Sequence, residues 1–261
     1  MAQEAIRMGT EESGRSAVRR SVLAYTLLLA VVQGGVALLL ARWPGPSSLA
    51  WYYLGVALPW TLLVGGLLAA NTGLLVTPEG RRLLRLNLAT RVSLIRVCCV
   101  PLVLTLIVAR QPIAAGLVFL GAALTDWLDG FLARRMRSVT WLGRIIDPSI
   151  DAVFCGSTLL ALGAVGRLPA WIMGLVVLRY GILVGGAVLL RFLLGSLPVR
   201  ATFFGRSAYL VQYALLAALL LLPAAWLGEW TSWALGLLQV AVSVQLLVLG
   251  AKLFREARRG G

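Results

Sequence analysis

Four aspartates lie in one short window of the sequence and carry its clearest chemical signal. Asp126, Asp129, Asp147 and Asp151 are the only Asp residues in the chain, and apolar runs long enough to cross a bilayer flank them on both sides. Burying an ionisable side chain in such a run is costly, so its presence indicates a functional site. We therefore expect this window to carry the chemistry of the protein.

The spacing divides the aspartates into two pairs. Asp126 and Asp129 are three residues apart, Asp147 and Asp151 are four apart, and each pair therefore shares one face of a helix. With about 1.5 Å of rise per residue, we expect Asp126 and Asp151 to lie roughly 10–12 Å from the cytoplasmic ends of two consecutive antiparallel helices, so that the four carboxylates can meet at one level. Four neighbouring carboxylates would repel one another or take up protons unless a cation joined them. Oxygen ligands favour Mg²⁺, Mn²⁺ or Ca²⁺ over zinc, and a bridging carboxylate would allow two ions.

Small and basic residues accompany the aspartates. Gly130, Ala133 and Gly143 would let a ligand or a neighbouring helix approach the backbone, although small residues in membrane helices also serve plain helix packing. Arg134 follows one turn after Gly130 and can hold a phosphate through two hydrogen bonds, or can anchor the helix at the membrane surface. Carboxylates, divalent metal and an Arg together favour a substrate that contains a diphosphate.

The window reads Asp-x2-Asp-Gly-x2-Ala-Arg-x8-Gly-x3-Asp-x3-Asp. This pattern resembles the signature of the CDP-alcohol phosphotransferase family, and all eight specified positions match it. The resemblance implies a six-helix membrane core, a CDP-linked alcohol as substrate, two Mg²⁺ or Mn²⁺ ions and a homodimer. Attack of an alcohol on the β-phosphorus would release CMP.

The resemblance also implies residue roles. Asp126, Asp129 and Asp147 would hold metal, while Asp151 would contact a second metal and act as the general base. The nucleotide site would be shaped by Gly130, Ala133, Arg134 and Gly143, with Thr140 from the connecting loop.

A second family pattern, Asn-x2-Thr-x2-Arg followed by Pro, precedes the window. Asn87 and Thr90 fit the first two positions of this pattern, but Ser93 stands where Arg is expected. If the alignment is moved by one helical turn, Thr90 and Ser93 take the Asn and Thr positions. Arg96 and Pro101 then follow as the Arg and Pro of the pattern. Thr90 and Ser93 are therefore further candidates for substrate binding.

Downstream, Gly205-Arg206-x2-Tyr209-x2-Gln212 resembles a Gly-Lys-x2-Thr-x2-Gln pattern of the family. A phosphorylated acceptor, such as glycerol 3-phosphate or inositol phosphate, would need cations near the aspartates, and the candidates are Arg179, Arg191, Arg200 and Arg206. The last three also fit topology anchors. Arg179 lies within an apolar run and therefore needs a partner.

The whole chain reads as an integral membrane protein made of helices. It has 261 residues, is 60% hydrophobic and has a mean hydropathy of +0.90, whereas soluble domains average about 45–50% apolar residues. The net charge of +14 does not indicate nucleic-acid binding, because no groove-reading motif accompanies it. Cys98, Cys99 and Cys155 lack metal-ligand spacing and suit buried thiols.

Breakers and charges predict an all-α, polytopic helix bundle. Residues 1–20 are expected to form a cytoplasmic tail, and two additional spans follow within 21–70. The basic stretch 71–91 suits an interfacial helix or a solvated loop. Residues 92–255 are expected to form the six-helix core. The expected spans are about 22–41, 51–70, 92–109, 112–133, 144–163, 169–190, 207–225 and 232–251.

The basic residues predict the orientation. With the N-terminus inside, the inner loops and tails hold 19 Lys and Arg residues and the outer loops hold 3. This asymmetry places both termini and the active site on the cytoplasmic side. We expect a multi-pass protein of the cell (inner) membrane.

The resulting hypothesis is a membrane phosphatidyltransferase that uses CDP-diacylglycerol and a polar alcohol. Serine or a second phospholipid as acceptor remains open within the same family. A divalent-cation transporter could use the same carboxylates, although no matching polar set lies across the membrane. An intramembrane aspartyl protease needs only two Asp sharing a proton, which four Asp and an Arg fit poorly.

Overall fold

The computed structural model is helical over most of the residues it describes. These are, for the backbone, 2–43, 48–71, 88–136, 141–194, 203–222 and 228–259, and for the side chains 18–43, 48–71, 94–125, 149–189, 192, 207–222 and 229–255. Within them no strand occurs. The eight helices are α1 (Ala2–Ala41), α2 (Ser48–Ala70), α3 (Leu88–Val108), α4 (Pro112–Met136), α5 (Trp141–Ala164), α6 (Ala170–Leu194), α7 (Phe203–Leu221) and α8 (Gly228–Arg259). The predicted all-α class is confirmed.

Four of these helices contain runs long and apolar enough to cross a bilayer: Val18–Ala41, Ser48–Ala70, Ala170–Leu189 and Glu229–Arg255. Shorter apolar helical runs in the described part of the chain are Leu94–Val108, Pro112–Thr125, Ser149–Ala164 and Ser207–Leu221. The segment predicted as a cytoplasmic tail is helical, because α1 begins at Ala2 and continues into the first apolar run. Residues 72–87, most of the predicted linker, lie outside the described residues.

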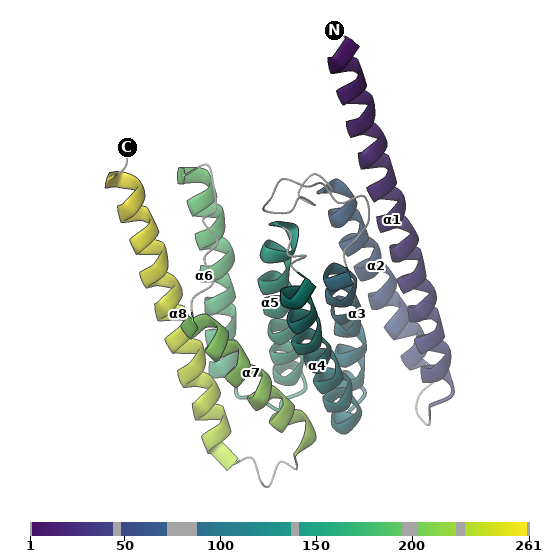
Figure 1. The fold of residues 1–261 in the computed structure, drawn as a ribbon. Helices are drawn as coiled ribbons and strands as arrows, with labels where there is room; N and C mark the ends of the chain where they lie inside the picture. Colours follow the sequence, from purple (N-terminus) through teal and green to yellow (C-terminus); the bar gives the residue numbers. More distant parts are fainter. Residues whose placement is uncertain are drawn as a thin grey trace. The chain divides into compact units, whose positions relative to one another are not determined.

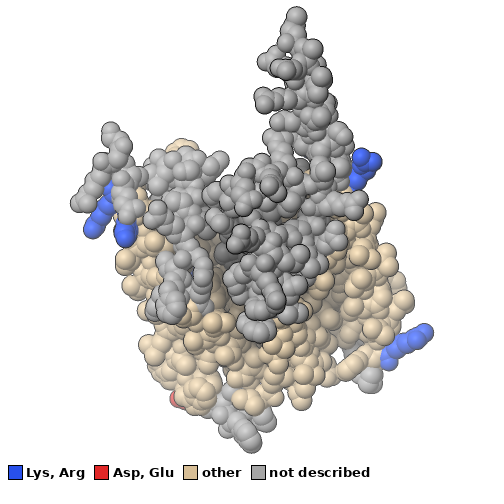
Figure 2. All heavy atoms as spheres, in the orientation of Figure 1, with Lys and Arg blue, Asp and Glu red and all other residues tan. Residues whose placement is uncertain are grey.

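Apolar side chains cover the described surface, as expected for helices that contact lipid. Leu27, Val31, Leu38 and Leu237 are each more than 60% exposed, as is Trp51. In Figure 2 the visible described surface is almost entirely neither basic nor acidic, with basic side chains at only a few places. A soluble protein rarely exposes so much contiguous apolar surface, so the chain is an integral membrane protein.

The chain forms two compact units. The first comprises Met1–Ala109 and Val118–Ile150, and the second comprises Arg110–Leu117 and Asp151–Gly261. In the first unit α1 packs along α2, and both contact α3 (Figure 1). In the second unit α8 packs against α6 and α7.

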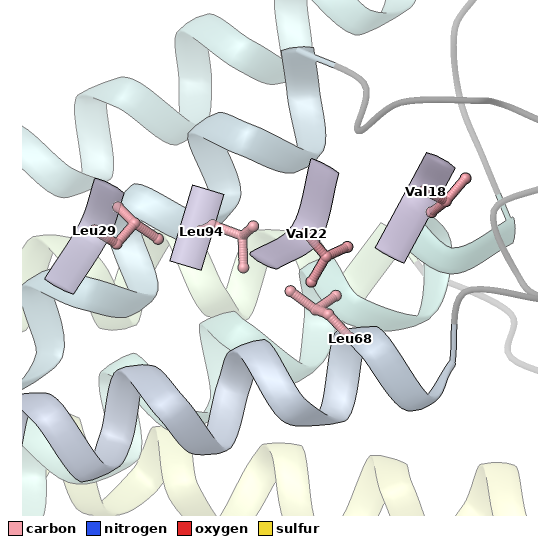
Figure 3. Close-up of a cluster of buried hydrophobic side chains, with 5 residues drawn as sticks. All are labelled: Val18, Val22, Leu29, Leu68 and Leu94. Carbon is pink, nitrogen blue, oxygen red and sulfur yellow. The ribbon is translucent and has the colours of Figure 1, made fainter. Parts of the chain in front are cut away.

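The first unit has an apolar cluster near the start of the α1 span. Val18, Val22 and Leu29 of α1 meet Leu68 of α2 and Leu94 of α3, as Figure 3 shows. At Gly65 of α2 the two N-terminal helices approach so closely that a Cβ atom would overlap the Thr26 side chain of α1. Such close approach at a small residue is how membrane helices gain packing energy.

Polar contacts extend this packing to α3. The Gln33 Nε2 atom of α1 donates hydrogen bonds to the Cys98 backbone oxygen at 3.1 Å and to Thr61 Oγ1 at 3.5 Å. Gln33 is 2% exposed, so its amide is paired within the unit, as a polar group in lipid requires. The two additional N-terminal helices are therefore bonded to the first helix of the expected core.

Candidate active site

Two helices carry the aspartate window. Asp126 and Asp129 lie on α4 together with Gly130, Ala133 and Arg134, and Gly143, Asp147 and Asp151 lie on α5. Both stretches are continuously helical, so the three- and four-residue spacings do place each pair on one helical face. Of these residues, Asp151 is the one whose side chain the structure describes.

The other predicted site residues fall outside the described side chains. Thr140 and Arg200 lie outside the described residues altogether. Thr90 and Ser93 lie on α3, Arg191 on α6 and Arg206 on α7, but the described side chains of these helices do not include them. Their roles stay predictions.

Asp151 has a defined partner in the second unit. Its half-buried carboxylate accepts, at Oδ1, a 3.0 Å hydrogen bond from the phenol of Tyr213 on α7. The Tyr213 ring also lies beside Phe154, one turn further along α5, with ring centroids 6.3 Å apart and planes inclined by 31°. Phe154 is fully buried. Tyr213 of α7 thus contacts two residues of α5. The sequence had not indicated Tyr213 as a functional residue.

A second polar cluster surrounds Arg179 of α6, which is 1% exposed. Its Nη1 atom donates to Gln212 Oε1 of α7 at 2.5 Å and to Gln239 Oε1 of α8 at 2.8 Å. Arg179 was expected to need a partner within the membrane, and these two amides fill that need. The downstream sequence pattern had included Gln212. Gln239 was not predicted from the sequence, where its one distinguishing feature is an amide side chain within an apolar run.

Two tyrosine rings complete the surroundings of the guanidinium. Its Cζ atom lies 5.5 Å from the ring centroid of Tyr180 and 5.4 Å from that of Tyr209, within the range of cation–π attraction. At Gly156 of α5, an added Cβ would come within 2.7 Å of the Tyr180 ring. The small residue there lets α5 pack directly against Tyr180.

The Arg179 cluster contains buried donors that have no acceptor among the described residues. These donors are Arg179 Nη2 and Gln239 Nε2, and both atoms are buried. Leaving buried donors unpaired is costly. The arrangement suits an anionic or strongly accepting group beside Arg179.

Comparison with known proteins gives the family context. Residues 86–245 match the CDP-alcohol phosphatidyltransferase family. The chain is 45% identical over 73 residues to proteins named CDP-diacylglycerol–glycerol-3-phosphate 3-phosphatidyltransferase from Escherichia coli (strain K12), Shigella flexneri serotype 5b and Shigella sonnei. In each case the aligned stretch is 27% of this chain and 40% of the relative. The chain thus spans about two fifths of the length of these relatives.

Proposed function

This chain belongs to the CDP-alcohol phosphatidyltransferase family, and we propose that it transfers the phosphatidyl group of CDP-diacylglycerol to a polar alcohol with release of CMP. The observation that carries the proposal is the eight-residue motif on α4 and α5, which lies inside the matched region. Carboxylates with an adjacent Arg suit binding and activation of a diphosphate.

The proposed acceptor is glycerol 3-phosphate. Two observations support it: the names of these relatives, which specify glycerol 3-phosphate as their acceptor, and the buried guanidinium of Arg179, whose Nη2 atom has no acceptor among the described residues. A phosphate accepts several hydrogen bonds and is attracted by a guanidinium. Arg191, Arg200 and Arg206 are further candidate contacts for this phosphate, which inositol phosphate would share.

The donor set of the motif fits Mg²⁺ or Mn²⁺, because four aspartates offer oxygen ligands only. Asp126, Asp129, Asp147 and Asp151 would hold two ions. When bound, these ions would stabilise the negative charge that develops on the diphosphate.

The protein side chains would do the rest. Arg134, with Gly130, Ala133 and Gly143, would hold the CDP group, and Thr140, Thr90 and Ser93 would add polar contacts. Asp151 would accept the proton of the acceptor hydroxyl. That oxygen then bonds to the phosphatidyl phosphorus, the bond from this phosphorus to the bridging oxygen breaks, and CMP leaves with the electron pair.

We further propose that the active site and both termini face the cytoplasm in the inner membrane. The excess of Lys and Arg in the expected inner loops supports this orientation. The homodimer is proposed on the family resemblance alone.

The proposal is tested with purified full-length protein and labelled CDP-diacylglycerol in detergent. CMP release is measured with glycerol 3-phosphate, inositol phosphate, serine or no acceptor, each with Mg²⁺, Mn²⁺ or excess EDTA. We expect release and a new lipid product with glycerol 3-phosphate, and loss of both in EDTA. Absence of CMP release with every acceptor would overturn the proposed function, and metal flux into liposomes under those conditions would favour a transporter.

A further inference from the structure

The described contacts of Asp151 point to a residue that the family pattern does not include. Tyr213 reaches Asp151 from α7, and the hydrogen bond of 3.0 Å has ordinary length for an O–H donor and a carboxylate oxygen. The chain therefore provides a specific orienting group for the side chain expected to act as the base.

The position of Tyr213 is fixed from two sides within the second unit. Its ring lies against the fully buried Phe154 of α5. The preceding residue, Gln212, is completely buried and bonded to Arg179 of α6. Since adjacent residues on a helix point about 100° apart, locking Gln212 toward α6 turns Tyr213 toward a different neighbour, and the contacts show this neighbour to be α5.

This fixation matters because a carboxylate on a helix has rotamer freedom. A donor held at one oxygen selects a single orientation of the carboxylate and leaves the second oxygen directed elsewhere. Partners that orient a metal ligand or a base in this way commonly change metal affinity or activity by about 10- to 100-fold when removed.

We propose that Tyr213 is a positioning residue for the transfer reaction: its phenol orients the carboxylate of Asp151 for proton abstraction and metal contact. The inference rests on the proposed function, because it assigns Tyr213 a role through Asp151. It assigns no contact between Tyr213 and the substrate.

The test compares three variants of the full-length protein. Tyr213→Phe keeps the ring against Phe154 and removes only the hydroxyl. Tyr213→Leu removes the ring as well. Tyr52→Phe is the matched control, because it removes the same hydroxyl from α2, where Tyr52 is 49% exposed. For each variant, kcat and KM for both substrates, Mn²⁺ affinity by electron paramagnetic resonance, and the melting temperature in detergent are measured.

We expect Tyr213→Phe to lower kcat about tenfold or more, with KM for CDP-diacylglycerol within twofold of the parent, and to weaken Mn²⁺ binding. Tyr213→Leu is expected to lower kcat to the same extent and the melting temperature further. The control should match the parent in every measurement.

The inference is overturned if Tyr213→Phe retains both kcat and Mn²⁺ affinity within twofold, or if only the melting temperature changes, since Tyr213 would then serve packing alone. Failure of the proposed function looks different: the parent itself would release no CMP. In that case the Mn²⁺ affinities of the parent, Tyr213→Phe and Tyr52→Phe still decide whether Tyr213 orients Asp151.

Discussion

The indole Nε1 of Trp60 on α2 donates a 3.0 Å hydrogen bond to the backbone carbonyl oxygen of Val97 on α3. In a regular helix this oxygen would accept from the amide four residues later, but that residue is Pro101, which lies inside α3 and has no N–H. Within a membrane a freed carbonyl must find another donor. Trp60 supplies it, so an N-terminal helix compensates for a proline in the matched region.

Trp60→Phe should therefore destabilise the protein, because it leaves the Val97 carbonyl without this donor while keeping most of the aromatic packing. We expect a loss of about 1 kcal/mol, seen as a lower melting temperature in detergent. Trp51→Phe, at a side chain 76% exposed on the same helix, is the control and should leave the melting temperature unchanged. Equal melting temperatures for the two variants would contradict the compensation.

Two substitutions at Gln239 should distinguish an effect on stability from an effect on binding of the acceptor. Gln239→Leu removes one of two acceptors from the buried guanidinium of Arg179 and should cost about 1.5–3 kcal/mol of stability. Gln239→Glu keeps an acceptor and adds a negative charge, so the fold should be retained. The new charge would repel a phosphate, however, and we expect KM for glycerol 3-phosphate to rise at least tenfold while KM for CDP-diacylglycerol is unchanged. An unaltered KM for glycerol 3-phosphate would place the acceptor phosphate away from Arg179.

Asp151→Asn should abolish transfer without removing the nucleotide site. The amide oxygen can still accept the hydrogen bond from Tyr213, so the side chain stays in place but cannot take a proton. A general base is worth roughly 10²–10⁴-fold, and we expect a fall in kcat of that size with CDP-diacylglycerol binding still measurable by calorimetry. Turnover near the parent rate would remove Asp151 from the base role.

Arg134→Ala should weaken binding of CDP-diacylglycerol. Charge-assisted hydrogen bonds contribute about 1.5–3 kcal/mol, which corresponds to a roughly 10- to 100-fold higher Kd. Arg42→Ala, which removes an exposed Arg just after α1, provides the comparison and should bind normally. If both variants bind the CDP-lipid like the parent, Arg134 is only an anchor at the membrane surface.

Hydropathy and breaker residues predicted the helical class because a membrane allows few alternatives to a helix for long apolar runs. They did not predict that α1 begins at Ala2. The segment before Val18 is polar, and polarity is typical of a tail. It contains no proline, however, and its Glu, Arg and Ala residues favour helix.

The partners of the functional side chains were harder to foresee. The motif identified Asp151, and its position in an apolar run marked Arg179 as needing a partner. Tyr213 and Gln239, by contrast, lie 62 and 60 residues away from the groups they contact. Which helices pack together, and with what rotation about their axes, depends on the fit of many side chains at once. No local pattern in the sequence encodes that fit.

The hydrogen bond between Trp60 and Val97 also makes the choice of residue at position 60 depend on the residue at position 101. A chain with proline at position 101 gains from an N–H donor at position 60, whereas a chain with any other residue at 101 supplies the missing amide itself. We therefore expect the two positions to covary among close homologues, and an exchange at one to be tolerated best when the other has already changed.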